Sequence, residues 1–266
     1  MKTSPPDLTM LDRPDILSRL FHPRPEIGGP QAPNVTGLMI PVEKKIAVGA
    51  DFYPAGEKAP TIVFFHGNGE IVADYQDLGP LYAMQGINFL PVDYRGYGRS
   101  GGHPTLSGMI RDSHKILDFV LDWLSKKRFT GPLFVMGRSL GSASALELAA
   151  RRENDLSGLI LESAFAYGVP LLNLLGVLIE NEQLVEEHIF QHPNKIKNFQ
   201  KPVLIIHAEF DHIIPVSDGL ALFEACGSEQ KTFIEIADAD HNDIFFRGRS
   251  RYMSAISSLC LGATPT

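Results

Sequence analysis

The chain has 266 residues, of which 44% are hydrophobic and 21% charged, and its net charge is −7. These values are typical of one globular domain with a large core, and the acidic balance argues against a nucleic-acid partner because no block of lysine and arginine offers a footprint for phosphates. The two cysteines, Cys226 and Cys260, are too few for a disulfide framework and lack the spacing of a zinc site, so we expect a reducing, cytoplasmic location. No apolar stretch is long enough for stable insertion into a membrane.

The first predicted elements are a surface segment and two strands. Residues 1–34 are rich in proline and predict a segment that wraps the surface, with one short helix near 15–21. The runs 35–41 and 46–52 predict two antiparallel strands at the start of a domain that extends to residue 266.

Apolar strands then alternate with helices of amphipathic spacing. Apolarity that is continuous along a strand predicts burial on both faces, as in a parallel sheet. The predicted strands are 61–65, 87–92, 133–136, 158–161, 203–207 and 232–236. The predicted helices are 73–85, 110–127, 142–150, 216–225 and 243–259. This alternation predicts an α/β fold in which a mostly parallel sheet lies between two layers of helices.

Residues 165–199 interrupt the alternation because their pattern is helical and contains no strand. We expect this interval to form a small helical cap over the site. Its apolar stripe could line an acyl pocket, contact a membrane or seal the sheet. Leu171 and Leu175 from this stripe are our candidates for contact with the substrate.

The run Gly137-Arg138-Ser139-Leu140-Gly141 lies between a predicted strand and a predicted helix. It predicts a sharp strand–turn–helix with Ser139 at the apex, where flanking glycines leave room for strand and helix to approach. The Ser139 hydroxyl would then lie at the end of the sheet, above a helix N-terminus. Such a position is typical of a nucleophile.

Asp211 and His241 each follow a predicted strand, at the sheet end where functional groups gather in α/β folds. A serine hydroxyl needs a base at neutral pH, imidazole can act as that base, and a carboxylate can orient the imidazole. Ser139, His241 and Asp211 would fill these roles in turn. Glu162, at the end of another predicted strand, is the alternative acid.

Hydrolysis also needs N–H donors for the developing oxyanion. We predict the backbone N–H groups of Leu140, directly after the nucleophile, and of Asn68, in the loop after strand 61–65. Arg138 beside the nucleophile either forms a structural ion pair or recognises an acidic group of the substrate, and we include it among the substrate-binding candidates. The histidines lack the spacing of metal ligands, so no metal site is expected.

Five motifs together resemble the α/β-hydrolase superfamily. They are His66-Gly67-Asn68-Gly69, Asp93 to Ser100, Gly137 to Ser142, Asp211 with Ile214-Pro215, and His241-Asn242-Asp243. They look most similar to the branch that contains the α/β-hydrolase domain-containing depalmitoylases and their bacterial relatives. The resemblance covers about residues 35–260 and implies the α/β-hydrolase fold with an eight-stranded sheet, a Ser-His-Asp triad and no cofactor. The chain departs from that branch in lacking a cysteine-rich N-terminus and in having Asp240, where glycine is usual, before His241.

These observations predict a serine hydrolase that cleaves a small-molecule carboxylic ester or thioester through an acyl-Ser139 intermediate. Esters and thioesters are favoured because their leaving groups demand less of the general acid than the leaving group of an amide. The alternatives are a small peptidase or amidase with the same triad, and a non-catalytic binding protein on a hydrolase scaffold.

Overall fold

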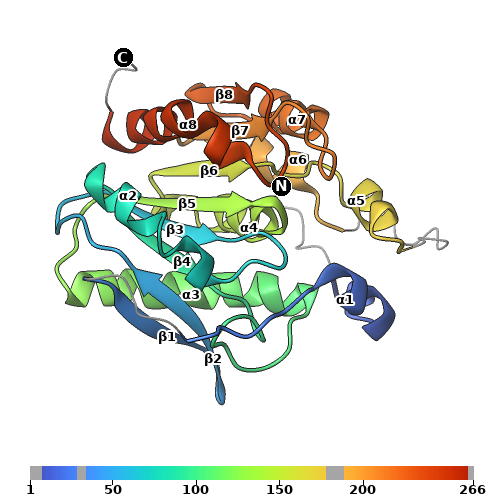
Figure 1. Ribbon diagram of the computed structural model, residues 1–266, viewed down its shortest axis with the longest axis horizontal. Helices are drawn as coiled ribbons and strands as arrows, with labels where there is room; N and C mark the ends of the chain where they lie inside the picture. The colour runs from blue at the N-terminus through green and yellow to red at the C-terminus, as the bar shows by residue number, and fades with distance from the viewer. Residues whose placement is uncertain (1–7, 29–33, 178–188, 263–266) are drawn as a thin grey trace.

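The computed structural model describes residues 8–28, 34–177 and 189–262 (Figure 1). In these residues one eight-stranded sheet has the order β1-β2-β4-β3-β5-β6-β7-β8. Its strands are β1 (Thr36–Glu43), β2 (Ile46–Phe52), β3 (Thr61–Phe65), β4 (Asn88–Val92), β5 (Leu133–Arg138), β6 (Gly158–Glu162), β7 (Val203–Ala208) and β8 (Lys231–Ile236). The β1–β2 and β2–β4 pairs are antiparallel and all other pairs are parallel, which confirms the predicted mostly parallel sheet.

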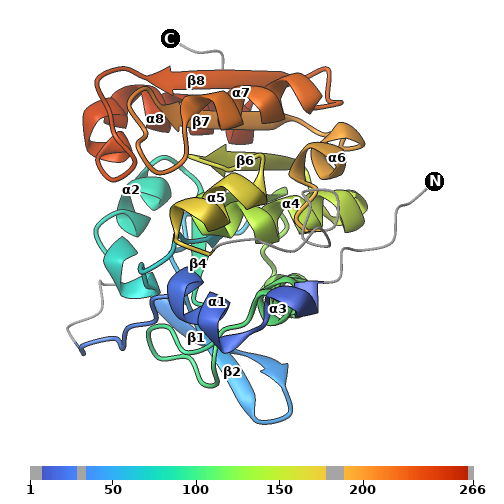
Figure 2. The ribbon, with the colours of Figure 1, turned by 90° about the vertical axis from the view of Figure 1, so that its right-hand side faces the viewer.

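Helices cover both faces of this sheet (Figures 1 and 2). The described helices are α1 (Pro14–Leu20), α2 (Gly79–Met84), α3 (Leu106–Lys126), α4 (Ser142–Arg151), α5 (Gly168–Leu174), α6 (His192–Lys197), α7 (Val216–Ala225) and α8 (Ile244–Leu261). Short 3₁₀ helices form at Leu8–Leu11 (η1), Val72–Tyr75 (η2), Ser139–Gly141 (η3) and Glu153–Asp155 (η4). Helices α2 and α8 lie on one face, and α3, α4 and α7 lie on the other.

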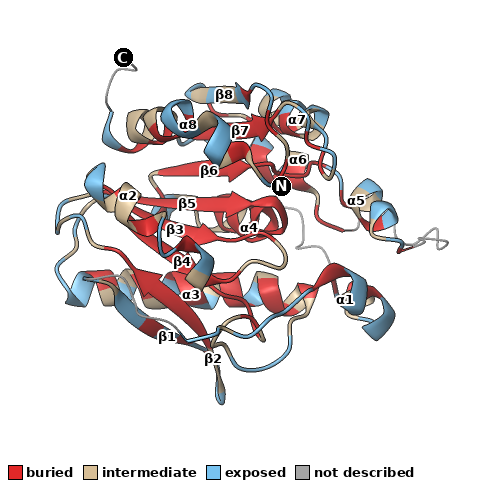
Figure 3. Ribbon diagram, in the orientation of Figure 1, coloured by how far each residue is buried: buried red, intermediate tan, exposed pale blue. Residues whose placement is uncertain are grey.

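The two helix layers enclose two apolar cores. The larger includes Leu106, Leu146 and Leu222 from α3, α4 and α7, and the smaller includes Tyr82 and Tyr252 from α2 and α8. Strands β3 to β7 in the middle of the sheet are buried along their whole length (Figure 3). Burial on both faces therefore accounts for the continuous apolarity that predicted these strands.

The single helix predicted over 73–85 is wrong. The chain forms η2, turns, and then begins α2 with Pro80 in its first turn. Proline lacks an N–H and restricts the residue before it, so it begins a new helix instead of continuing one. Helix α3 begins four residues before its predicted start, because the Thr105 hydroxyl accepts a hydrogen bond from Gly108 N at 3.0 Å and caps it.

The segment near the N-terminus contributes to the larger core through Leu11, Ile16 and Leu20, which are almost fully buried. Figures 1 and 2 both place α1 beside α5, at the sheet end to which the parallel strands point. Helices α5 and α6 fall within the predicted cap, and residues 178–188 of that cap lie outside the described residues. The division into segment, domain and cap stays a prediction. Within the described ranges, no helix combines the length and apolar composition that a membrane crossing requires.

Candidate active site

Ser139 occupies a sharp turn between β5 and α4. Its φ of 51° lies in the left-handed region, which residues with a side chain rarely adopt. A Cβ atom on Gly137 would lie 2.5 Å from the Gly141 carbonyl oxygen, and one on Gly141 would lie 2.1 Å from the Phe65 carbonyl oxygen. Only glycine therefore fits on either side of this serine, and Gly141 brings the turn against the end of β3.

His241 and Asp211 meet at the same end of the sheet. Asp211 Oδ2 lies 2.7 Å from Nδ1 of His241, and the two residues are buried. Asp211 Oδ1 accepts hydrogen bonds from the backbone N–H groups of Ile213 at 3.1 Å and Ile214 at 2.8 Å. Burial would raise the pKa of Asp211, but the hydrogen bond and charge of His241 outweigh it and hold the pKa below its ordinary value. The ionised carboxylate orients the imidazole and leaves its Nε2 for another partner.

Glu162, the alternative acid, has other partners. Its Oε1 pairs with Arg138 Nη1, and its Oε2 accepts a hydrogen bond from Tyr252 Oη at 2.5 Å. Both carboxylate oxygens are thus occupied in the core beside α8. The structure brings His241 together with Asp211 and not with Glu162.

Arg138 is buried next to Ser139, the predicted nucleophile, and donates from all three guanidinium nitrogens. Besides Glu162, its Nε donates to Glu70 Oε1 at 2.8 Å and its Nη2 donates to the His241 carbonyl oxygen at 2.8 Å. This agrees with the ion-pair alternative, and contact of Arg138 with a substrate stays a prediction. The position directly before Ser139 connects the histidine loop to the loop after β3.

Glu70 anchors the loop that contains the predicted oxyanion donor. Its Oε2 accepts from Gly67 N at 2.7 Å and from Tyr75 Oη at 2.6 Å. Burial would raise the pKa of Glu70, but the charge of Arg138 and the hydrogen bond from Tyr75 lower it to about 2. Glu70 is therefore a permanent anion at neutral pH, and it fixes the Gly67 backbone.

The two predicted oxyanion donors lie on neighbouring turns. Strands β3 and β5 pair in parallel with Phe65 opposite Gly137, so the loops that contain Asn68 and Leu140 leave the sheet at the same level. Leu140 lies in η3 directly after Ser139, and the Asn68 side chain is hydrogen-bonded to groups outside its loop. Their role in binding an oxyanion stays a prediction.

A second histidine, His207, is absent from the predictions and lies close to Asp211. The Nε2 of His207 donates to the Ile214 carbonyl oxygen at 2.8 Å and lies 3.6 Å from Asp211 Oδ2. Burial lowers the pKa of His207, which favours the neutral form of its ring. The sequence could have indicated this histidine through its position in β7, four residues before Asp211.

Asp240 does not face the histidine ring. Its Oδ1 accepts from the backbone N–H groups of Asn242 at 2.7 Å and Asp243 at 3.0 Å, so it closes its own turn. The side chains of Leu171 and Leu175 are half-buried and pack against the larger core. Among the described residues, no cluster of histidine, cysteine, aspartate and glutamate is suited to a metal ion.

A parallel sheet with a strained serine after β5 and an Asp–His pair after β7 and β8 is the arrangement of an α/β hydrolase. The family model Hydrolase_4, described as serine aminopeptidase, S33, matches residues 56–188. That match spans half of the chain, and the chain belongs to this family.

Individual proteins are also similar to most of the chain. Bem46 of Schizosaccharomyces pombe is 31% identical over 194 residues, which cover 70% of this chain and 63% of Bem46. Alpha/beta hydrolase domain-containing protein 17B of Homo sapiens is 30% identical over 197 residues, which cover 71% of this chain and 62% of that protein. The chain thus covers less than two thirds of either relative.

Among solved structures, the Pyrococcus furiosus esterase Pf2001 superposes with a TM-score of 0.71 at 17% identity, covering 90% of this chain and 98% of the esterase. At this identity the likeness shows the fold. Together with the family match, it confirms the resemblance inferred from the motifs.

Proposed function

We propose that the chain is a serine hydrolase that cleaves small-molecule carboxylic esters or thioesters with Ser139, His241 and Asp211. The observation that carries this proposal is the 2.7 Å bond between buried Asp211 and His241, at the sheet end where Ser139 adopts its left-handed conformation. A buried carboxylate on imidazole Nδ1 is the arrangement that general-base catalysis beside a serine requires.

In the proposed reaction, Ser139 Oγ attacks the carbonyl carbon while His241 Nε2 takes the hydroxyl proton. Asp211 stabilises the imidazolium that forms, and the N–H groups of Leu140 and Asn68 bind the oxyanion. His241 then returns the proton to the leaving alcohol or thiol. A water molecule, deprotonated by His241, releases the acid from Ser139. Leu171 of α5 and Leu175, the residue that directly follows this helix, are the proposed contacts of the acyl group.

Replacing the nucleophile tests this proposal. Ser139→Ala should lower the turnover of an activated short-chain ester by at least about 10⁴-fold, because substrate binding alone cannot replace the lost nucleophile. Ser125→Ala, at an exposed position of α3, is the matched control and should retain full activity. Retained activity in Ser139→Ala would refute the assignment. Failure of the wild-type chain to react with a fluorophosphonate probe would favour the non-catalytic alternative.

The family description favours a peptidase as the second candidate. The same triad serves ester and amide bonds, and the leaving group decides between them. Comparing kcat/KM for an ester and an amide of the same acyl group separates the candidates, with the ester expected to react much faster. We place the enzyme in the cytoplasm, since Cys226 and Cys260 are both buried and unpaired.

A further inference from the structure

A segment near the N-terminus lies across the proposed oxyanion loop. The backbone N–H of His22 donates to Asn68 Oδ1 at 3.0 Å, and the ring Nδ1 of His22 lies 2.9 Å from Asn68 Nδ2. Two residues further on, Arg24 Nε donates to the Gly69 carbonyl oxygen at 2.8 Å. Residues 21–26, which we term the strap, therefore hold both Asn68 and the residue that follows it.

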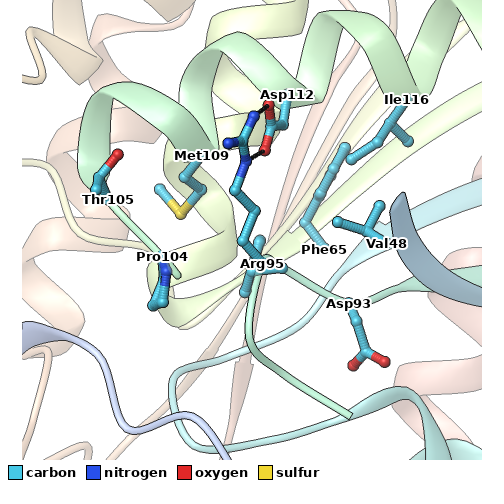
Figure 4. A pocket seen from close by; sticks show the side chains of 10 residues that line it. Val48, Phe65, Asp93, Arg95, Pro104, Thr105, Met109, Asp112 and Ile116 are labelled. Atoms are coloured by element: carbon cyan, nitrogen blue, oxygen red, sulfur yellow. Dashed lines mark hydrogen bonds and ion pairs between the residues drawn. The ribbon is translucent and has the colours of Figure 1, made fainter. Parts of the chain in front are cut away.

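The strap is itself fixed by the loop that follows β4. Gly98 N donates to the Arg24 carbonyl oxygen at 2.9 Å, and Glu26 N donates to the Gly98 carbonyl oxygen at 3.2 Å. In the same loop, Arg95 donates two hydrogen bonds to Asp112 of α3, at 2.6 and 2.8 Å (Figure 4). The loop after β4 is thus tied to α3 and holds the strap through backbone hydrogen bonds at Gly98.

Tyr97 of this loop connects the strap to Asn68. Its buried hydroxyl donates to Asn68 Oδ1 at 2.7 Å and accepts from His22 N at 2.9 Å. Because Asn68 Oδ1 accepts from both partners, the amide nitrogen of Asn68 is the donor to His22 Nδ1. The bonds are mutually consistent, so they fix the orientation of the Asn68 side chain.

We infer that the strap is a positioning element of the oxyanion hole, in which His22 acts through Asn68 on the N–H group that binds the oxyanion. Glycines flank Asn68, and Gly69 has a φ of +78°, so the loop has little conformational preference of its own. None of these bonds uses the N–H of Asn68, which stays available for a ligand. Oxyanion stabilisation depends on donors that are oriented before the reaction begins. The inference rests on the proposed function.

A double-mutant cycle tests it with an activated ester. Asn68→Ala keeps the N–H but removes the anchor, so kcat should fall about 10-fold with KM changed less than about twofold. His22→Ala should lower kcat about fivefold, and the double variant should be no slower than Asn68→Ala, because both changes break one connection. His22→Asn, whose Oδ1 can replace Nδ1 as the acceptor, should restore kcat. Arg13→Ala is the control, because Arg13 pairs with its exposed neighbour Asp15.

Additive effects in the double variant, a change confined to KM, or an unchanged kcat in His22→Ala would overturn the inference. If the wild-type chain neither turns over the ester nor reacts with a fluorophosphonate, the proposed function fails. In that case, amide hydrogen exchange of residues 66–70 tests whether the strap orders this loop. Faster exchange in His22→Ala than in Arg13→Ala would show that the strap orders this loop, and equal exchange would refute it.

Discussion

The loop from His66 to Glu70 is held by two regions of opposite character. On its inner side, Glu70 bonds to Arg138, and that arginine continues to Glu162 with side chains only 9% and 6% exposed. On its outer side, the strap holds Asn68 and Gly69, and its ion pair between Arg24 and Asp74 is 45% and 40% exposed. One loop is thus anchored by desolvated charges on one side and by groups in contact with water on the other.

This difference in exposure predicts that the two anchors affect the stability of the fold and the geometry of the loop to different degrees. Removing one partner of a buried ion pair leaves a charge that the low-dielectric interior cannot solvate. Removing a partner in the strap lets water take its place, so the fold loses little. The inner anchor should therefore control folding and activity together, whereas the outer anchor should control activity with little effect on folding.

Arg138→Met should have the largest effect on stability. It leaves Glu70 and Glu162 without their cation and should lower the free energy of unfolding by about 3–5 kcal/mol, measured by urea denaturation. Lys126→Met is the matched control, because Lys126 pairs with Asp122 on the surface of α3 with side chains 73% and 59% exposed. The control should change stability by less than about 0.5 kcal/mol. Equal effects in the two variants would show that the buried ion pairs of Arg138 contribute no more to stability than an exposed pair.

The effect of Glu70→Gln on the free energy of unfolding should depend on pH, because the inner anchor depends on the charge of Glu70. Because the pKa of Glu70 is lowered to about 2, the unfolded chain binds a proton more readily than the folded chain. The carboxylate therefore contributes stability that is fully present above its unfolded pKa of about 4.5 and is lost as the pH falls towards 2. Wild type should exceed Glu70→Gln by about 2–3 kcal/mol at pH 6.5, and the difference should shrink at pH 3.5. A difference independent of pH would show that Glu70 does not act through its charge.

The sequence predicted the parts of this site that depend on local patterns. Gly137 and Gly141 flank Ser139 within one turn, and the alternation of strands with helices identified the strands before Asp211 and His241. An ion pair of Arg138 was predicted only as one of two alternatives, and its partner Glu70, 68 positions away, was not identified. An ion pair of that separation leaves no periodic signal in either segment.

The strap could not be predicted. His22 and Asn68 are 46 positions apart, and the proline-rich segment around His22 has neither helical nor strand periodicity. Its position is decided by the glycine-rich loop at Gly98, where backbone groups pair with Arg24 and Glu26. Backbone pairing between irregular segments depends on tertiary structure and is encoded by no side-chain pattern.

The smallest effect should come from Arg24, which has two separable contacts. Its Nε donates to the Gly69 carbonyl oxygen at 2.8 Å, and its Nη2 pairs with Asp74. Arg24→Gln places an amide nitrogen at the Nε position without a charge, whereas Arg24→Lys keeps the charge and moves the donor beyond that position. Either change should alter the free energy of unfolding by less than about 1 kcal/mol, because the ion pair is exposed.

If the strap acts through the loop backbone, Arg24→Gln should keep a kcat within about twofold of wild type, and Arg24→Lys should fall about threefold below it. If the ion pair matters more, the order reverses, and 1 M salt should then slow wild type towards Arg24→Gln because it screens exposed charges. In that case the outer anchor, like the inner one, would act through charge, and the two anchors would differ only in how far their ion pairs are exposed to water.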